Sequence, residues 1–315
     1  MPRVYFHCMA STVREESMPG PVSTTTRPGV WLTDASLVLM ALIWGVNFSV
    51  VKYGTSLVDP RAYNAMRVGL AAVTLVIIVA VGRLPLPSKR DALGLLGLGF
   101  LGNGIYQYFF VEGIARTSAS NTALVVAASP ALIALIGRIR GVERVSGRGM
   151  TGIALSMTGI ALVVLGSART VAGDSSLTGD LFVLCGSVCW AIYTVLLKPY
   201  TARVKGFQLS ALTMVGGAIP LALVASPTIA ATHWSGFSTL GWLAVLYSGV
   251  GSLVVAYYFW YHGVRVLGPT RTAMYSNLQP VIAILVAWLL LHETPTPWQG
   301  IGAACIMTGL LLTRM

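Results

Sequence analysis

The chain has 315 residues, of which 55% are hydrophobic and only 10% are charged. Soluble domains carry roughly 25% charged residues, so this composition excludes a water-soluble globular protein. The net charge is +11, from 21 Lys and Arg against 10 Asp and Glu, and the mean hydropathy is +0.76. The apolar segments are therefore compared with a bilayer, which needs about 20 residues for each spanning helix.

Residues 1–30 are rich in Ser, Thr, Pro and charge, and contain no apolar stretch long enough for the core of a signal peptide. We expect a disordered cytoplasmic tail in this region. Met18 is an alternative start site, and the first apolar helix would then act as an uncleaved insertion signal.

Ten apolar segments follow the tail, separated by short polar pieces that leave no room for a soluble domain. They show no alternation of apolar and polar residues, which argues against a barrel, and backbone groups in hydrocarbon must pair within their own segment. The sequence thus predicts an all-α polytopic membrane protein with ten transmembrane helices, at residues 32–52, 62–81, 91–111, 118–137, 148–167, 180–199, 208–226, 239–261, 270–291 and 297–313.

The basic residues lie mainly on one side of these helices. The tail, every second loop and the C-terminus hold sixteen Lys and Arg, whereas the opposite side holds Lys52, Arg61, Arg116 and Arg169. Cytoplasmic loops carry an excess of Lys and Arg, so both termini are predicted to be cytoplasmic. Because the basic residues form no continuous face, we expect no nucleic-acid partner.

The second half of the sequence repeats the first at an offset of 150 residues, as in the triplet MTG at 157–159 and again at 307–309. Five helices per unit is an odd number, so the copies insert in opposite directions. Inverted repeats are typical of secondary transporters, with the substrate site near the midplane. We assign the units to 31–168 and 179–314. Other matched pairs are Gly113 and Gly263, Pro130 and Pro280, Glu143 and Glu293, Gly152 and Gly302, and, at an offset of 146, Trp44 and Trp190.

Two features resemble a known family. LIWGVNFSVVKYG, which starts at Leu42, is similar to the opening helix of EamA-type members of the drug/metabolite transporter superfamily. The Pro, Glu, Gly, Gly pattern of that family occurs twice, in 119–166 and 277–312. The resemblance covers about residues 32–313 and implies a ten-helix carrier, commonly an exporter of amino acids or other small metabolites. Arg138 and Arg140 depart from it, because they interrupt a helix end that is usually apolar.

Most of the repeated residues have a structural interpretation that we favour. Glycines seven residues apart let helices approach closely, and mid-helix prolines bend a segment. Glu143 and Glu293 at helix ends fit capping or loop salt bridges better than proton coupling. Cys185 and Cys189 lie one turn apart but lack further ligands, so we expect packing and no metal site.

Arg67 is the one basic residue well inside an apolar segment. Such residues are functional candidates, although Arg can extend to the interface. Two interpretations stay open: a structural ion pair with Glu112 or Asp59, which we favour, and contact with a solute carboxylate.

Amide and aromatic side chains gather in several predicted helices. Buried amides without partners cost several kcal/mol, so these residues are predicted to face a wet cavity or one another. Hydrogen bonding between helices alone is the alternative for any single residue. The candidate solute-binding residues are Trp44, Asn47, Asn103, Tyr106, Trp190, Tyr193, Tyr258, Tyr275, Asn277 and Gln279.

Several functional motifs are absent from the sequence. No Asp or Glu lies near the middle of a predicted helix, and there is no Walker-type phosphate loop, HExxH or paired-carboxylate motif. We therefore expect no cofactor and favour a secondary transporter of the inner or plasma membrane. It would export a neutral, zwitterionic or amphipathic metabolite such as an amino acid. A passive channel, facilitator or scaffold is the main alternative function. An intramembrane enzyme is a less favoured alternative. Neither the solute, the energy coupling nor the oligomeric state follows from the sequence.

Overall fold

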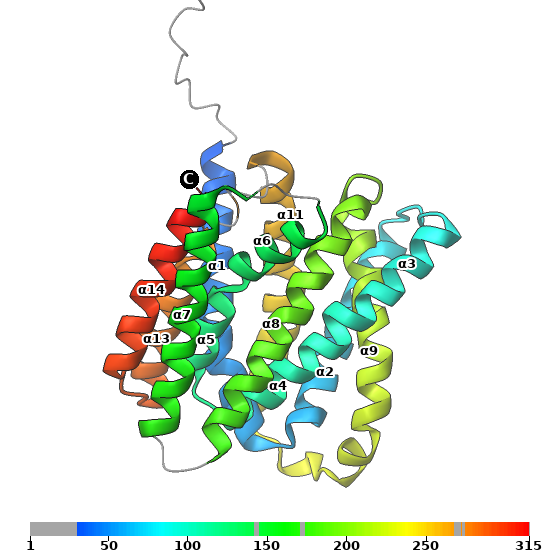
Figure 1. The fold of residues 1–315 in the computed structure, drawn as a ribbon. Helices are drawn as coiled ribbons and strands as arrows, with labels where there is room; N and C mark the ends of the chain where they lie inside the picture. The colour runs from blue at the N-terminus through cyan, green and yellow to red at the C-terminus, as the bar shows by residue number, and fades with distance from the viewer. Residues whose placement is uncertain (1–29, 142–144, 171–173, 268–271, 273–274, 315) are drawn as a thin grey trace, which may run out of the picture.

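A computed structural model describes residues 30–141, 145–170, 174–267, 272 and 275–314. The predicted tail, apart from Val30, and Glu143 lie outside the described residues. Within the described part of the chain every regular element is helical and no strand occurs, which confirms the all-α class. Figure 1 shows the long helices lying side by side.

The first half contains seven α-helices and one π-helical segment. Their bounds are α1 (Val30–Leu57), α2 (Pro60–Val81), α3 (Lys89–Gly99), η1 (Phe100–Ile105), α4 (Tyr106–Arg116), α5 (Ala119–Ala127), α6 (Ser129–Ile139) and α7 (Gly147–Thr170). The second half contains α8 (Asp174–Thr201), α9 (Gly206–Ala231), η2 (Trp234–Gly236), α10 (Thr239–Leu246), η3 (Tyr247–Val255), α11 (Ala256–Leu267), α13 (Leu278–Leu291) and α14 (Pro297–Arg314).

Seven helical segments of the described chain are long and apolar enough to cross a membrane, and two of them are the runs α5–α6 and α10–η3–α11. Two shorter apolar helices, Leu278–Leu291 and Pro297–Leu312, occupy two further predicted segments. The continuous run α3–η1–α4 occupies the remaining predicted segment. This run is less apolar because it contains the buried polar residues Asn103, Gln107 and Glu112. The structure thus supports several spans, whereas the count of ten stays a prediction.

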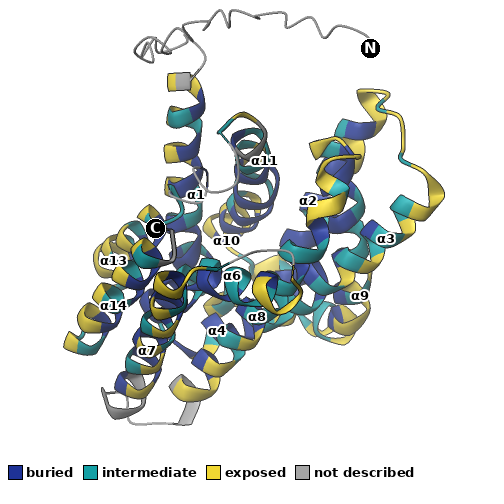
Figure 2. Cartoon of the chain, turned by 45° about the horizontal axis from the view of Figure 1, so that its top comes forward, coloured by how far each residue is buried: buried dark blue, intermediate teal, exposed yellow. Residues whose placement is uncertain are grey.

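Large apolar side chains cover the outward faces of the helices. Val73 is 56% exposed, Leu223 is 70% exposed and Leu289 is 57% exposed. Figure 2 shows this distribution, with buried residues on the inward sides. Exposed apolar surface on this scale needs an apolar environment, and lipid supplies it.

Polar side chains begin three of these helices at the positions where free backbone N–H groups need acceptors. Asp59 accepts from the backbone N–H of Arg61 at 2.9 Å before α2, with Pro60 at the first helical position. Ser118 accepts from Asn121 at 3.0 Å before α5, and Ser238 caps α10 in the same way. Short polar motifs therefore set these helix boundaries.

Helices α7 and α14 pack antiparallel through the glycines that the repeat had matched. A Cβ atom on Gly159 would lie 2.7 Å from the carbonyl oxygen of Gly302, and one on Gly309 would lie 2.4 Å from that of Gly152. Under the 150-residue offset these two contacts are equivalent to each other. Between them, Ser156 donates to the carbonyl of its own equivalent, Ile306, at 3.5 Å. The contacts therefore have the reciprocity of a local two-fold axis.

The same reciprocity extends beyond this helix pair. A Cβ on Gly113 would contact Val183, and one on Gly263 would contact Leu37, which is the equivalent of Val183 at an offset of 146. Close backbone approach also pairs Gly99 with Thr213 and Gly249 with Arg67. Repeat-equivalent residues thus occupy equivalent positions, with Thr213 at the position that corresponds to Arg67.

Both repeats interrupt their fourth helix just before the matched proline. Helix α5 ends at Ala127 and α6 begins at Ser129, one residue before Pro130. In the second half, Ser276 and Asn277 form a turn and α13 begins at Leu278, two residues before Pro280. The π-helical segments η1 and η3 likewise overlap under the 150-residue offset. Irregular helix therefore occurs at matched places in both halves.

Candidate functional site

Aromatic side chains from four parts of the chain meet in the interior. Tyr257 of α11 contacts Trp44 of α1 and Trp190 of α8, with ring centroids 5.7 Å and 6.1 Å apart. Trp190 also lies 5.1 Å from Tyr106 of α4 and 5.2 Å from Tyr193. We call these five residues the aromatic cluster. Because both repeats contribute to it, the cluster lies where the two halves meet.

The π-helical segments place polar groups next to this cluster. Trp44 donates its indole N–H to the carbonyl of Ser252 in η3 at 3.1 Å. Asn103 lies in η1, and the equivalent position in the second half is Leu253. Single-turn π-segments are frequent at functional sites, because the wider turn alters the hydrogen-bonding pattern of the backbone.

Two buried amides in this region have atoms without protein partners. Within the described part of the chain, the Oδ1 of Asn47 and both amide atoms of Asn103 make no hydrogen bond of good geometry, although Asn103 lies near the hydroxyl of Tyr193 and the two residues are 7% and 0% exposed. Each buried polar group without a partner costs about 1–3 kcal/mol. A bound polar solute or water would recover that free energy, which makes these amides the strongest of the sequence-predicted candidates.

Arg67 lies in α2 and is only 1% exposed. Its Nε donates to the Oδ1 of Asn64 at 3.1 Å, and its Nη2 donates to the Oε1 of Gln107. Asn64 in turn donates to the backbone carbonyl of Gln107 at 3.0 Å. The guanidinium carbon lies 5.7 Å from the ring centroid of Phe110. The charge is therefore oriented by two neutral amides and an aromatic ring.

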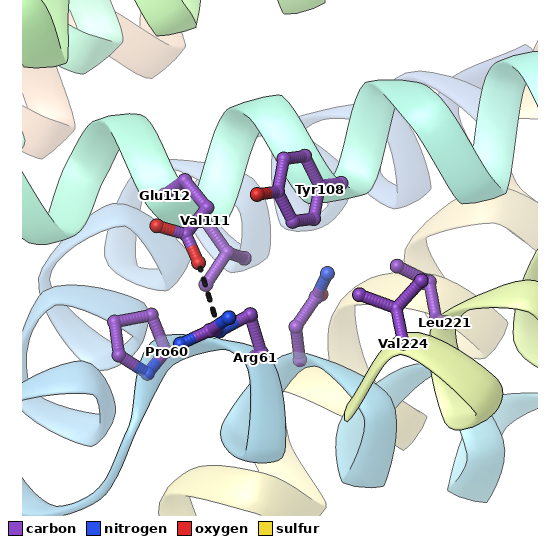
Figure 3. A pocket seen from close by; sticks show the side chains of 8 residues that line it. Pro60, Arg61, Tyr108, Val111, Glu112, Leu221 and Val224 are labelled. Carbon is purple, nitrogen blue, oxygen red and sulfur yellow. Dashed lines mark ion pairs between the residues drawn. The ribbon is translucent and has the colours of Figure 1, made fainter. Parts of the chain in front are cut away.

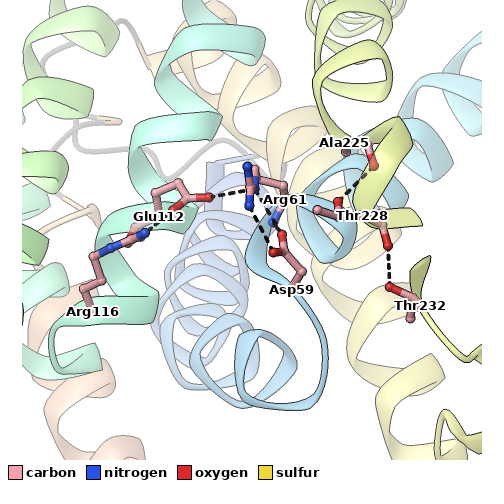
Figure 4. A network of polar contacts seen from close by, with 7 residues as sticks. All are labelled: Asp59, Arg61, Glu112, Arg116, Ala225, Thr228 and Thr232. Atoms are coloured by element: carbon pink, nitrogen blue, oxygen red, sulfur yellow. Dashed lines mark hydrogen bonds and ion pairs between the residues drawn. The ribbon is translucent and has the colours of Figure 1, made fainter. Parts of the chain in front are cut away.

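The favoured ion pair of Arg67 with Glu112 or Asp59 was a wrong expectation. Glu112 instead pairs with Arg116 and, at 3.8 Å, with Arg61. Asp59 pairs with Arg61 at 3.2 Å, because both residues lie at the start of α2 (Figure 4). Burial acts to raise the pKa of Asp59, but the hydrogen bonds and charge of Arg61 outweigh it and hold that pKa below its ordinary value.

A shallow depression, with no room for a water molecule, lies beside this charged network, between α2, α4 and α9. Figure 3 shows Tyr108 and Glu112 on one side of it and Leu221 and Val224 on the other. Asn64, the hydrogen-bond partner of Arg67, also lines it. A second hollow of ≈ 460 Å³ lies between the opposite end of α2 and α9, with a mainly apolar lining that includes Arg83 and Gln208.

Lys52 and Glu293 bind the two helix ends at the turn between α4 and α5. The Nζ of Lys52 donates to the carbonyls of Ile114, Ala115 and Thr117 at 3.0, 3.1 and 2.5 Å. Glu293 accepts from the N–H of Ala119 at 2.9 Å and from two groups of Ser120 at 3.1 and 2.8 Å. A cation therefore faces a helix C-terminus and a carboxylate a helix N-terminus, as the helix dipoles favour. For Glu293 this is the capping geometry that we expected.

Buried polar residues extend this contact set across the same end of the molecule. Thr117 donates to Asp180 at 2.6 Å, and the side-chain amide of Asn121 lies 3.3 Å from Asp180. Gln299 of α14 donates to the Oδ1 of Asn121 at 2.7 Å. We call these residues, together with Lys52, Ser120 and Glu293, the polar seal. The seal joins elements of both repeats.

Four of the predicted site residues lie apart from the aromatic cluster. Tyr258 is 46% exposed and stacks on Phe207 at 5.1 Å. Tyr275 donates to Asp34 at 2.7 Å near the start of α1. Asn277 lies in the turn before α13, and Gln279 is 9% exposed at its first turn.

Three residues of the site were absent from the predicted set: Tyr257, Gln107 and Asn64. The sequence pattern favoured Tyr258, whereas the structure turns its neighbour Tyr257 toward the two tryptophans. The sequence repeat contained a signal for Tyr257, because this residue lies at the position equivalent to Gln107 under the 150-residue offset. Asn64 carried no such signal.

No group of three or more potential metal ligands occurs among the described residues. Cys185 is exposed and Cys189 is half-buried, and both are free thiols. The geometry therefore offers no support for a metal site in this part of the chain.

Lipid-facing apolar helices around a polar, charged and aromatic interior define a multi-pass membrane protein. The EamA-like transporter family model matches residues 31–165 and again residues 177–315. The chain therefore belongs to the EamA-like transporter family.

Several relatives cover most of this chain. An uncharacterized transporter, YyaM of Bacillus subtilis, is 29% identical over 87% of this chain and 91% of its own length. A probable terminal-alkyne amino-acid exporter of Streptantibioticus cattleyicolor is 26% identical over 88% and 91%. A probable amino-acid metabolite efflux pump of Escherichia coli is 26% identical over 87% and 92%. A solved crystal structure shares the fold, with a TM-score of 0.62 at 21% identity, over 89% of this chain and 98% of that one.

Proposed function

We propose that this protein is a secondary transporter that exports a small, amphipathic, amino-acid-like metabolite by alternating access. The observation that carries the proposal is the aromatic cluster between the two halves, with the partnerless amides of Asn47 and Asn103 in the same interior. Carriers built from inverted repeats bind their solute at the repeat interface.

The proposed topology has ten membrane-spanning helices in two inverted units, 31–168 and 179–314, in the cell membrane. Both termini are cytoplasmic. The reciprocal contacts of α7 with α14 support the inverted relation, and the basic residues, sixteen against four, support the orientation.

Alternating access needs contacts that close one end of the site and then release it. In the proposed orientation the polar seal lies at the extracellular end, where Glu293 joins α5 to the connection before α14. The interrupted helices before Pro130 and Pro280 supply bending points in both halves. Irregular backbone of this kind is tolerated at membrane depth where protein or a water-filled cavity surrounds it.

The aromatic lining favours a solute with an apolar side chain and an ammonium group. An aromatic face attracts a cation by roughly 0.5–2 kcal/mol, according to its desolvation. The printed names of two relatives, an amino-acid exporter and an amino-acid metabolite efflux pump, support the same class.

The experiment is an untargeted comparison of the growth medium of cells with and without the protein. Cells that make it should accumulate a specific small metabolite outside, and Trp190→Ala should abolish that accumulation at equal protein levels. The same external metabolites in both cultures would contradict export.

A further inference from the structure

The buried charge of Arg67 has no counter-ion among the residues that the structure describes. Its hydrogen-bond acceptors, Asn64 and Gln107, are neutral, and no carboxylate lies within 4.0 Å of it among the described residues. Taking an unpaired charge out of water is energetically costly. A fully buried arginine held only by amides therefore leaves a site that an anion would stabilise.

The fold does not require an arginine at this position. Its repeat-equivalent is Thr213, whose backbone makes the same close approach to Gly99 that the backbone of Arg67 makes to Gly249. Thr213 satisfies its hydroxyl within its own helix, by donating to Leu209 at 3.0 Å. Because a small neutral residue suffices in one half, the charge in the other half calls for a functional explanation.

The surroundings of Arg67 connect it to the aromatic cluster. Phe110 lies beside the guanidinium, and its ring centroid is 5.9 Å from that of Tyr106, which contacts Trp190. A solute with its charged end at Arg67 would therefore extend its apolar part along these rings.

We infer that Arg67 binds the carboxylate of the transported solute, and that the solute is an amphipathic monocarboxylate. This inference rests on the proposed function. A planar guanidinium presents donors in a fork that matches a carboxylate, while Asn64 and Gln107 hold the fork without neutralising it. Lys52 is not available to a second carboxylate on the solute, because it is engaged with three carbonyls.

The test compares each of the twenty amino acids with its primary amide, which keeps the side chain and amino group but lacks the carboxylate. Thermal unfolding of the purified full-length protein reports binding, because a ligand of the folded state raises the midpoint. At least one acid should bind at least about tenfold more tightly than its amide, since a site built for a charged group rejects the analogue without it.

The diagnostic variant is Arg67→Gln, which removes the charge. It should bind acid and amide within about twofold of each other, whereas Arg67→Lys should keep part of the preference. Arg116→Gln, on an exposed arginine of α4, is the matched control and should keep the full preference. Equal binding of acids and amides by the parent protein would overturn the inference without any variant, even if Arg67→Gln fails to fold.

Two further outcomes would also overturn it. One is an unchanged acid preference in Arg67→Gln. The other is a stabilisation by sodium chloride alone that matches the best amino acid at the same concentration, which would assign Arg67 to an inorganic anion. Failure of the proposed function looks different, because then no solute, acid or amide, would be transported by the parent protein.

Discussion

Lys52 and Glu293 bind opposite helix ends at a single turn, although they are 241 residues apart in the sequence. Lys52 donates hydrogen bonds to the last carbonyls of α4, and Glu293 accepts hydrogen bonds from the first N–H groups of α5. Because one residue comes from each repeat, the two halves are joined at this turn by charge–dipole contacts. Such contacts can form and break without unpacking an apolar core, which suits the proposed opening of this end during transport.

We predict that Glu293 acts in capping and not as an obligatory proton carrier. Glu293→Ala should destabilise the protein by about 0.5–2 kcal/mol through loss of the cap, and Glu293→Gln by less, because its amide oxygen still accepts. Transport driven by a pH gradient should persist in Glu293→Gln. The measurement is flux into proteoliposomes together with thermal unfolding; a complete loss of flux in folded Glu293→Gln would show a role in proton coupling.

A second prediction concerns the glycine contact between α7 and α14. A Cβ at Gly302 would lie 2.5 Å from Val163 and 2.9 Å from the carbonyl of Gly159, whereas one at Gly300 would meet nothing within 4 Å. Gly302→Ala should therefore destabilise the protein by about 1–3 kcal/mol through overpacking. Gly300→Ala, in the same helix, should be neutral or stabilising. The thermal unfolding midpoints of both variants test this prediction, and equal midpoints would contradict close packing at Gly302.

The third prediction uses the buried amide of Asn103, whose equivalent in the second repeat is Leu253. Asn103→Leu removes two polar atoms without hydrogen bonds and keeps the number and branching of the side-chain heavy atoms, so the variant should be at least as stable as the parent. Its transport should fall about tenfold or more if the amide contacts the solute. A destabilised variant with normal transport would contradict both parts.

A fourth prediction separates two neighbouring tyrosines. Tyr257→Ala should reduce transport about tenfold or more, because it removes the ring that contacts both Trp44 and Trp190. Tyr258→Ala should stay within about twofold of the parent, since Tyr258 is largely exposed and stacks on Phe207. A larger loss of transport in Tyr258→Ala than in Tyr257→Ala, at equal amounts of protein in the membrane, would indicate that Tyr258 belongs to the site and contradict the prediction.

Asn277 is a further sequence-predicted contact, for which Asn277→Ala should weaken solute binding about tenfold. Its side chain makes no capping bond at the start of α13, so capping does not explain the residue. Calorimetry on purified protein is the measurement, and an unchanged affinity at unchanged thermal stability would remove Asn277 from the site.

Much of the architecture follows from the sequence because lipid imposes simple rules. Apolar length predicts helices, and the seven-residue spacing of the glycines predicts close helix packing, as the contact of Gly159 with Gly302 confirms. Identical spacing in two copies carries information that a single copy lacks. For the same reason, the interruptions before Pro130 and Pro280 occur at matched places.

The site was less predictable because it depends on side-chain direction. Tyr257 and Tyr258 are neighbours in the sequence, and the structure turns Tyr257 toward the aromatic cluster, whereas Tyr258 stacks on Phe207. Arg67 presented a related difficulty. From the sequence we expected Arg67 to form an ion pair with Glu112 or Asp59. In the structure Arg61 and Arg116 lie closer to those carboxylates, at the helix ends.

The ten-helix topology can be tested independently of the solute. Reporter fusions after Met315 and within the segment 172–175 should report opposite sides of the membrane, because five helices separate them in the predicted topology. Fusions that report the same side would contradict both the count of ten and the inversion of the repeats.

Counterflow into proteoliposomes tests the central claim, that a carrier alternates around a central site, most directly. Vesicles loaded with an excess of the metabolite found in the growth medium should accumulate the labelled compound transiently above its external concentration. Trp190→Ala should abolish this overshoot, because the solute loses the ring that contacts Tyr106 and Tyr257. Rapid equilibration without an overshoot in the parent protein would indicate a passive channel and contradict the account.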